Sequence, residues 1–108
     1  MKNLSGYQKR IDDELQEYEK PYWEPLSILA RLAEETGEVA RIINHQYGDK
    51  PKKKDEEHDH LGDELADVLY ACICLANREN INLDEHLEKA ISKLSTRDKD
   101  RFKKKSKD

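Results

Sequence analysis

The segment Leu61 to Ala76, LGDELADVLYACICLA, constrains the fold more than any other part of this sequence. From Val68 to Ala76 it carries no charge, although 41% of the residues in the chain are charged. A helix that is apolar around its whole circumference belongs in the interior of a bundle. Glu64 and Asp67 lie at its start, three residues apart, so both carboxylates leave the same face. Burying two like charges there requires a compensating positive charge.

The size of the chain allows one domain, and its composition provides little core. With 108 residues and 35% hydrophobic residues, it has too little apolar surface for a self-sufficient globule, so we expect a core shared between subunits. Residues 1–108 form a single domain in this interpretation. Residues 97–108 hold seven Lys or Arg and three Asp, which predicts a basic, partly disordered tail. A net charge of −4 argues against a binder of nucleic-acid polymers.

The apolar runs and the cysteines indicate the compartment. No run is long enough to cross a bilayer, and none follows Met1, so we expect a soluble cytoplasmic protein without membrane contact. Cys72 and Cys74 lie on different sides of a helix and cannot form a disulfide with each other. We interpret them as small buried residues in a reducing compartment.

Apolar periodicity predicts an all-α fold with four helices. Pro25 suits the first turn of the second helix, and Gly48 suits its end. Asn82, with Glu85 three residues later, predicts the start of the fourth helix. The expected helices cover about residues 4–18, 25–47, 61–80 and 83–95.

Two connecting segments leave alternatives open. Trp23 and Tyr22 lie between two prolines, where they either stack on a planar base or plug the space under a loop. The connector 49–59 is either a solvated loop or a basic flap over a polyanion. His58 and His60 would suit zinc only with a second Cys/His pair, which the sequence lacks.

Two pairs of carboxylates carry the functional signal. Glu35 and Glu38 form a second pair one turn apart, on the helix that precedes the connector. If the two long helices pack antiparallel, all four carboxylates converge with Glu64 and Asp67. Hard oxygen ligands in this number suit Mg²⁺, with Mn²⁺ as a substitute. The alternative is that these acids are the solvated faces of two surface helices.

Two stretches, EETGEVARIIN and ELADVLYACICLANRENINLDE, resemble the MazG-type nucleoside triphosphate pyrophosphohydrolases in their short single-domain form. The resemblance covers about residues 22–102. It implies a four-helix MazG-like bundle assembled as a homodimer or homotetramer. It also implies hydrolysis of an NTP or dNTP to the monophosphate and pyrophosphate.

The resemblance assigns roles to individual residues. The family's metal ligands fall on Glu35, Glu38, Glu64 and Asp67, and its phosphate-contacting basic residues resemble Lys93 and Arg97. Glu34 or Glu35 is the candidate for orienting or deprotonating the attacking water. Asn77 and Trp23 complete the candidate substrate contacts.

Two other classes of function compete with this interpretation. The first is a non-catalytic helical interaction module whose acidic face binds a metal or a partner. The second is a di-metal oxidoreductase bundle, but that architecture uses Glu-x-x-His pairs, which are absent at the relevant turns.

Overall fold

The computed structural model describes residues 2–51 and 60–106, and this part of the chain has four helices and no strand. The helices are α1 (Leu4–Leu15), α2 (Pro25–Tyr47), α3 (Leu61–Arg78) and α4 (Leu83–Ser95). The expected all-α fold is confirmed. Most of the charged connector, including His58, lies outside the described residues.

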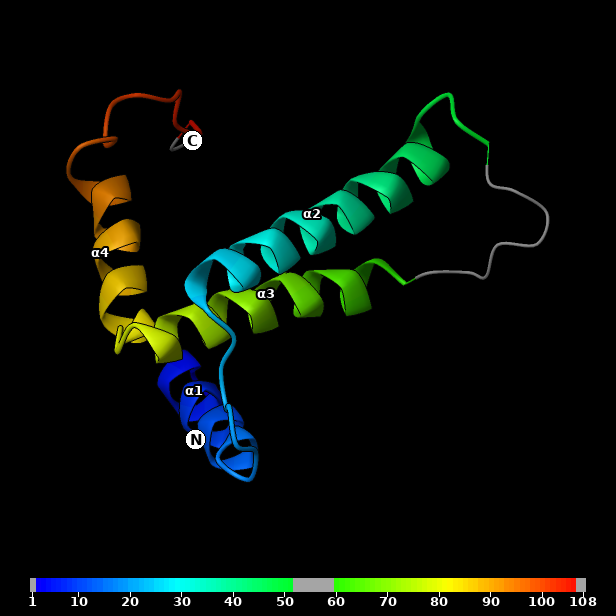
Figure 1. Cartoon of the computed structure of the whole chain (residues 1–108). Coiled ribbons are helices and arrows are strands. Elements are labelled where there is room, and N and C mark those ends of the chain that lie inside the picture. The colour runs from blue at the N-terminus through cyan, green and yellow to red at the C-terminus, as the bar shows by residue number, and fades with distance from the viewer. Residues whose placement is uncertain (1, 52–59, 107–108) are drawn as a thin grey trace.

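Helix α3 is the central element. It runs antiparallel to α2 along most of its length, and it also packs against α1 (Figure 1). Helix α4 packs mainly against α1 and stands apart from the α2 and α3 pair. The buried apolar residues are Ile28 and Ile42 on α2 and Ala71, Ile73 and Ala76 on α3.

Two helices end earlier than periodicity alone predicts. Helix α1 ends at Leu15, and the N–H of Tyr18 bonds back to the Leu15 carbonyl in a turn. This turn lets the chain reverse, and the Tyr22 hydroxyl then donates a hydrogen bond to Asp12. Helix α3 ends at Arg78 because Asn80 has a left-handed backbone with φ of 57°, which a right-handed helix cannot continue.

A buried glutamine joins α1 to both sides of the turn between α3 and α4. The Gln8 amide donates to the Asn77 Oδ1 at 3.0 Å and to the Ile81 carbonyl at 2.8 Å. Its Oε1 accepts from the N–H of Leu83, also at 3.0 Å. Because all these polar atoms are satisfied, burying the side chain costs little.

The start of α1 is capped by an acid from α4. Asp84 accepts hydrogen bonds from the backbone N–H groups of Leu4 and Ser5, at 3.1 and 3.2 Å. Hydrogen bonds from the Ser5 side chain and from these two N–H groups hold the pKa of Asp84 below its usual value. A carboxylate at a helix N-terminus also interacts favourably with the helix dipole.

A single chain leaves apolar surface uncovered. Leu65 and Leu69 on α3 are exposed, and α4 contains no buried residue. Helix α3 is thus central, yet one of its faces is open in the monomer. No helix in the described part is long and apolar enough to cross a membrane.

Candidate active site

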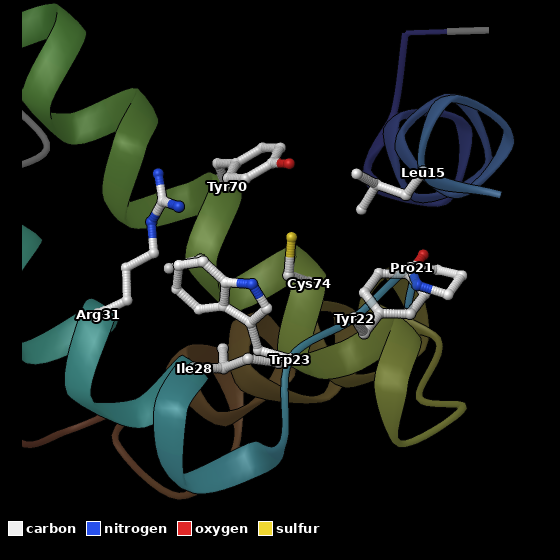
Figure 2. Close-up of a pocket in the computed structure, with 9 residues that line it drawn as sticks. Leu15, Pro21, Tyr22, Trp23, Ile28, Arg31, Tyr70 and Cys74 are labelled. Atoms are coloured by element: carbon white, nitrogen blue, oxygen red, sulfur yellow. The ribbon is translucent and has the colours of Figure 1, made fainter. Parts of the chain in front are cut away.

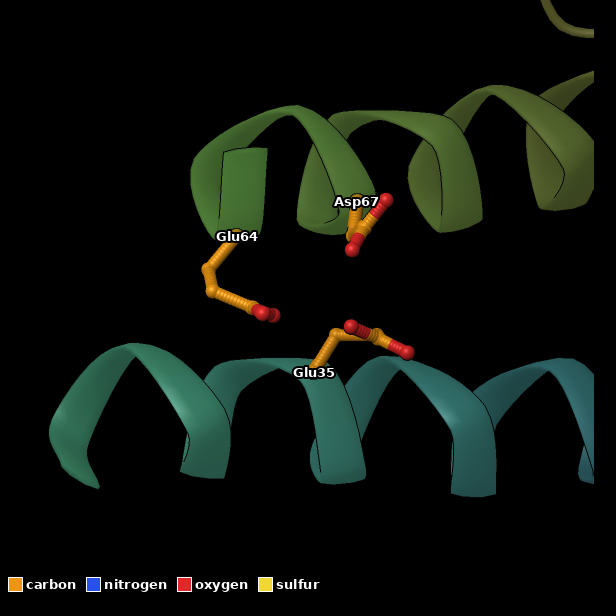
Figure 3. Close-up of side chains that lie close together, drawn as sticks. All are labelled: Glu35, Glu64 and Asp67. Carbon is orange, nitrogen blue, oxygen red and sulfur yellow. The ribbon is translucent and has the colours of Figure 1, made fainter. Parts of the chain in front are cut away.

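Three of the four predicted metal ligands meet between α2 and α3. Glu35 projects from α2 toward Glu64 and Asp67 on α3, and one carboxylate oxygen from each lies within 4.8 Å of the others (Figure 3). The spacing of three residues places both α3 acids on one face, and the antiparallel packing brings that face to Glu35.

The donor set suits a small hard cation. Oxygens bound to one Mg²⁺ at ~2.1 Å lie ~3.0 Å apart in adjacent positions and ~4.2 Å apart in opposite ones, so side-chain rotations that bring these oxygens roughly one to two ångströms closer complete such a site. All three candidate ligands are carboxylates, and no thiol or imidazole belongs to the cluster. The residues therefore fit Mg²⁺ or Mn²⁺.

Glu38 does not belong to this cluster in the described part of the chain. Its carboxylate lies 3.6 Å from the Arg41 guanidinium, and its side chain is 48% exposed, against 20% for Glu35. A turn of α2 is slightly longer than three residues, so Glu38 leaves the helix at a different angle from Glu35. Its assignment as a metal ligand stays a prediction.

An open hollow of about 360 Å³ adjoins the cluster on the α2 side. Trp23, Arg31, Glu34 and Glu35 are among the residues that line it. Glu34 is exposed, so its carboxylate is accessible to water beside Glu35.

A second cavity of about 180 Å³ lies between α1, α3 and the start of α2, and most of its wall is aromatic or apolar (Figure 2). Trp23 is 52% exposed, which does not suit a residue that plugs a loop. Burial raises the pKa of Tyr70 and of the Cys74 thiol. Its lining includes Leu15, Tyr22, Trp23, Arg31, Tyr70 and Cys74.

Asn77 supports this cavity from behind. Its amide donates to the Gln8 carbonyl and to the Tyr22 hydroxyl, both at 3.0 Å. Burial and the hydrogen bond to Asp12 raise the pKa of Tyr22 to about 12. The geometry gives Asn77 a role in orienting Tyr22, and a direct contact with substrate stays a prediction.

The predicted phosphate contacts lie on a different part of the chain. Lys93 is in the last turn of α4, and Arg97 follows that helix and pairs with Asp98 at 3.1 Å. Both basic residues are exposed. Because α4 packs on α1 rather than along α2, one chain does not bring them beside the carboxylate cluster (Figure 1).

Arg31 and Tyr70 lie beside the cluster, although the sequence pattern did not indicate either as a site residue. The Arg31 guanidinium carbon is 5.7 Å from the centre of the Trp23 ring and 5.6 Å from that of Tyr70. One available signal was the spacing, since Arg31 precedes Glu35 by four residues and shares its helix face.

Comparison with known proteins identifies the family. The model of the MazG nucleotide pyrophosphohydrolase domain matches residues 23–102. YpjD of Bacillus subtilis (strain 168), an uncharacterized protein, is 41% identical over 104 residues, which cover 96% of this chain and 94% of YpjD. The crystal structure of Bacillus subtilis YpjD superposes with a TM-score of 0.78 at 38% identity, over 89% of this chain and 98% of that one.

A second solved structure agrees. The Bacillus-conserved MazG protein, a nucleotide pyrophosphohydrolase, has a TM-score of 0.75 at 39% identity, over 93% of this chain and 97% of that chain. The matched region contains every residue of the carboxylate cluster. The chain therefore belongs to the MazG family of nucleotide pyrophosphohydrolases.

Proposed function

We propose that this chain hydrolyses nucleoside triphosphates, NTP or dNTP, to the monophosphate and pyrophosphate in a Mg²⁺-dependent reaction. The observation that carries this proposal is the convergence of Glu35, Glu64 and Asp67 within 4.8 Å, in a chain of the MazG family. A triphosphate is strongly anionic, and three carboxylates would repel it without a cation between them.

The carboxylates divide the work between binding and activation. Glu35, Glu64 and Asp67 would hold the metal, with Glu38 as a further ligand after rotation away from Arg41. Bound Mg²⁺ supplies positive charge toward the phosphate oxygens and acidifies water. Glu34 and Glu35 face the same hollow, so either can orient or deprotonate a water beside the metal ligands.

We also propose that the protein works as a homodimer or homotetramer. Its radius of gyration is 18.1 Å, whereas a compact chain of this length has ~13 Å. Exposed Leu87, Ile91 and Leu94 on α4 give an apolar stripe that a second subunit can cover. Assembly also offers a route by which Lys93 and Arg97 of one subunit reach phosphates bound at another.

The cellular role follows from the reaction class. Hydrolysis of free nucleotides to monophosphates suits removal of unwanted nucleotides from the cytoplasmic pool, and we propose this house-cleaning role. We also propose that residues 1–108 form a single domain and that the basic residues from 97 onward are its tail.

The test is a panel of NTPs and dNTPs incubated with Mg²⁺, with Mn²⁺ or with EDTA, with separate detection of pyrophosphate and orthophosphate. We expect pyrophosphate with either metal and none in EDTA. Glu35→Gln should abolish turnover, whereas Glu14→Gln, an exposed acid on α1, should not. Stepwise release of orthophosphate, or full activity in EDTA, would refute the proposal. Complete inactivity would favour a binding module.

A further inference from the structure

The aromatic cavity has the size and the wall of a site for one flat ring. Its volume is about 180 Å³, and a buried apolar cavity of ~150 Å³ is enough to bind benzene. Tyr22, Trp23 and Tyr70 contribute aromatic surface to it. A six-membered heterocycle, or the six-membered half of a purine, therefore fits and can stack on these rings.

Arg31 gives this cavity a polar edge with a hydrogen-bond donor that lacks an acceptor. Its side chain lines the cavity, and its Nε donates no hydrogen bond to any group within residues 2–51 and 60–106. Its Nε is buried, and the nearest carboxylate oxygen, on Glu35, is 4.0 Å away, too far for a hydrogen bond. A guanidinium can only donate, so a ligand that presents an acceptor here relieves a buried donor.

The cavity lies about one helical turn away from the metal ligands along both α2 and α3. Arg31 precedes Glu35 by four residues on α2, a rise of ~6 Å, and Tyr70 follows Asp67 by three residues on α3. Because the helices are antiparallel, both displacements point in the same direction. Trp23 and Arg31 also line the hollow that reaches Glu35, so the ring site and the hollow beside the carboxylates are adjacent.

We infer that this cavity receives the base of the nucleotide, and that Arg31 selects bases with a carbonyl oxygen at the ring edge over bases with an amino group there. The inference rests on the proposed hydrolysis of nucleotides. Guanine, hypoxanthine, uracil and thymine present such an oxygen. Adenine and cytosine present a donor at the equivalent position, which leaves the guanidinium unpaired and places two donors face to face.

Matched substrates test this selection without changing ring size. GTP and ATP form one pair, and UTP and CTP form the other. We expect kcat/KM to favour the carbonyl member of each pair about 10- to 100-fold, the range for a hydrogen bond to a charged group. Ratios near one in the wild-type protein would overturn the inference while leaving the proposed hydrolysis intact.

Substitution of Arg31 shows whether that residue is responsible. Arg31→Met keeps an unbranched side chain between the two rings but removes every donor, so both ratios should fall to about one. Each ratio is measured within one protein, so a general loss of activity through Glu35 cancels. Arg10→Met removes an arginine that stacks on Tyr7 outside the cavity, and it should keep the ratios. Unchanged ratios in Arg31→Met would overturn the inference.

A binding measurement separates this inference from catalysis. Trp23 is the only tryptophan in the chain, so its fluorescence reports directly on the cavity. In EDTA, titration with GMP should give a dissociation constant about tenfold or more below that with AMP, and Arg31→Met should remove the difference. Equal constants for wild type would overturn the inference, whereas a selective but inactive protein would refute the proposed hydrolysis alone.

Discussion

Replacement of Asp67 by asparagine should abolish turnover without weakening the metal-free fold. Asp67 has oxygens within 4.8 Å of both Glu35 and Glu64, and the described residues offer it no ion pair. Two unit charges at 4.8 Å repel by ~3.5 kcal/mol at an effective dielectric constant of about 20, and by ~0.9 kcal/mol at about 80. Two of the three pairs contain Asp67, so the relief lies between ~2 and ~7 kcal/mol before solvent relaxation.

The partly solvated position of the cluster puts the expected relief at the low end, about 1–2 kcal/mol. For a domain of this size, ~1 kcal/mol shifts Tm by roughly 4 °C. We therefore expect metal-free Asp67→Asn to melt at least as high as the wild type, and up to about 8 °C higher. Addition of Mg²⁺ at ten times its Kd should stabilise the wild type by ~1.4 kcal/mol and the variant by much less.

The assay is a thermal melt of both proteins at equal concentration, with and without Mg²⁺, beside a pyrophosphate assay. Asp63→Asn is the matched control, because it removes an exposed carboxylate from the same helix outside the cluster. It should lose a favourable interaction with the helix dipole, melt slightly lower and keep its response to Mg²⁺. An Asp67→Asn protein that melts lower, keeps its Mg²⁺ response and still turns over would refute the reasoning.

Three further predictions concern the packing of α1 and the assembly of subunits. Asp84→Asn should lower the free energy of unfolding at neutral pH. Because the pKa of Asp84 is lower in the folded state, its stabilisation is present above the unfolded pKa near 3.8 and is lost as pH falls through the folded pKa. Urea titrations of both proteins at pH 6 and pH 3 can detect this loss. Tyr22 should ionise only near pH 12, so its stabilisation persists up to about pH 10 and is lost as pH rises toward 12. Tyr22→Phe should remove the tyrosine that ionises last in an ultraviolet titration. It should also leave the Asn77 amide without one acceptor, which should cost ~1–3 kcal/mol of stability in a thermal melt. Ile91→Glu should dissociate the oligomer in light scattering, and a folded wild-type monomer at micromolar concentration would contradict the assembly.

The fold was predictable where local signals act. Pro25 and Gly48 mark the ends of α2, and the structure places the helix between them. The convergence of Glu35 with Glu64 and Asp67 follows from the spacing of the acids and from the antiparallel packing of two long helices. These features depend on neighbours a few residues apart, which periodicity records.

Features that depend on distant side chains were not predictable. Gln8 shows no pattern that distinguishes it from an exposed polar residue of α1, yet its partners lie about 70 residues later. Arg31 stacks between a linker residue and an α3 residue, so its setting exists only after the helices have packed. Glu38 pairs with Arg41 rather than joining the cluster, and the spacing of the acids does not indicate which charged neighbour Glu38 will pair with.

The contacts of α1 have a consequence for the order of folding. Asp84 reaches Leu4 across 80 residues, and Gln8 reaches Asn77 across 69, whereas α2 and α3 are neighbours in the chain. Closing a long loop costs entropy before any long-range contact rewards it, so we expect the α2 and α3 hairpin to form first. During synthesis α1 emerges first, but its contacts with α3 and then with Asp84 form only after those later residues have left the ribosome. The contacts of α1 with α3, α4 and Tyr22 should therefore form last. The backbone N–H groups of Leu4 and Ser5, which bond to Asp84, should be among the first to exchange with solvent.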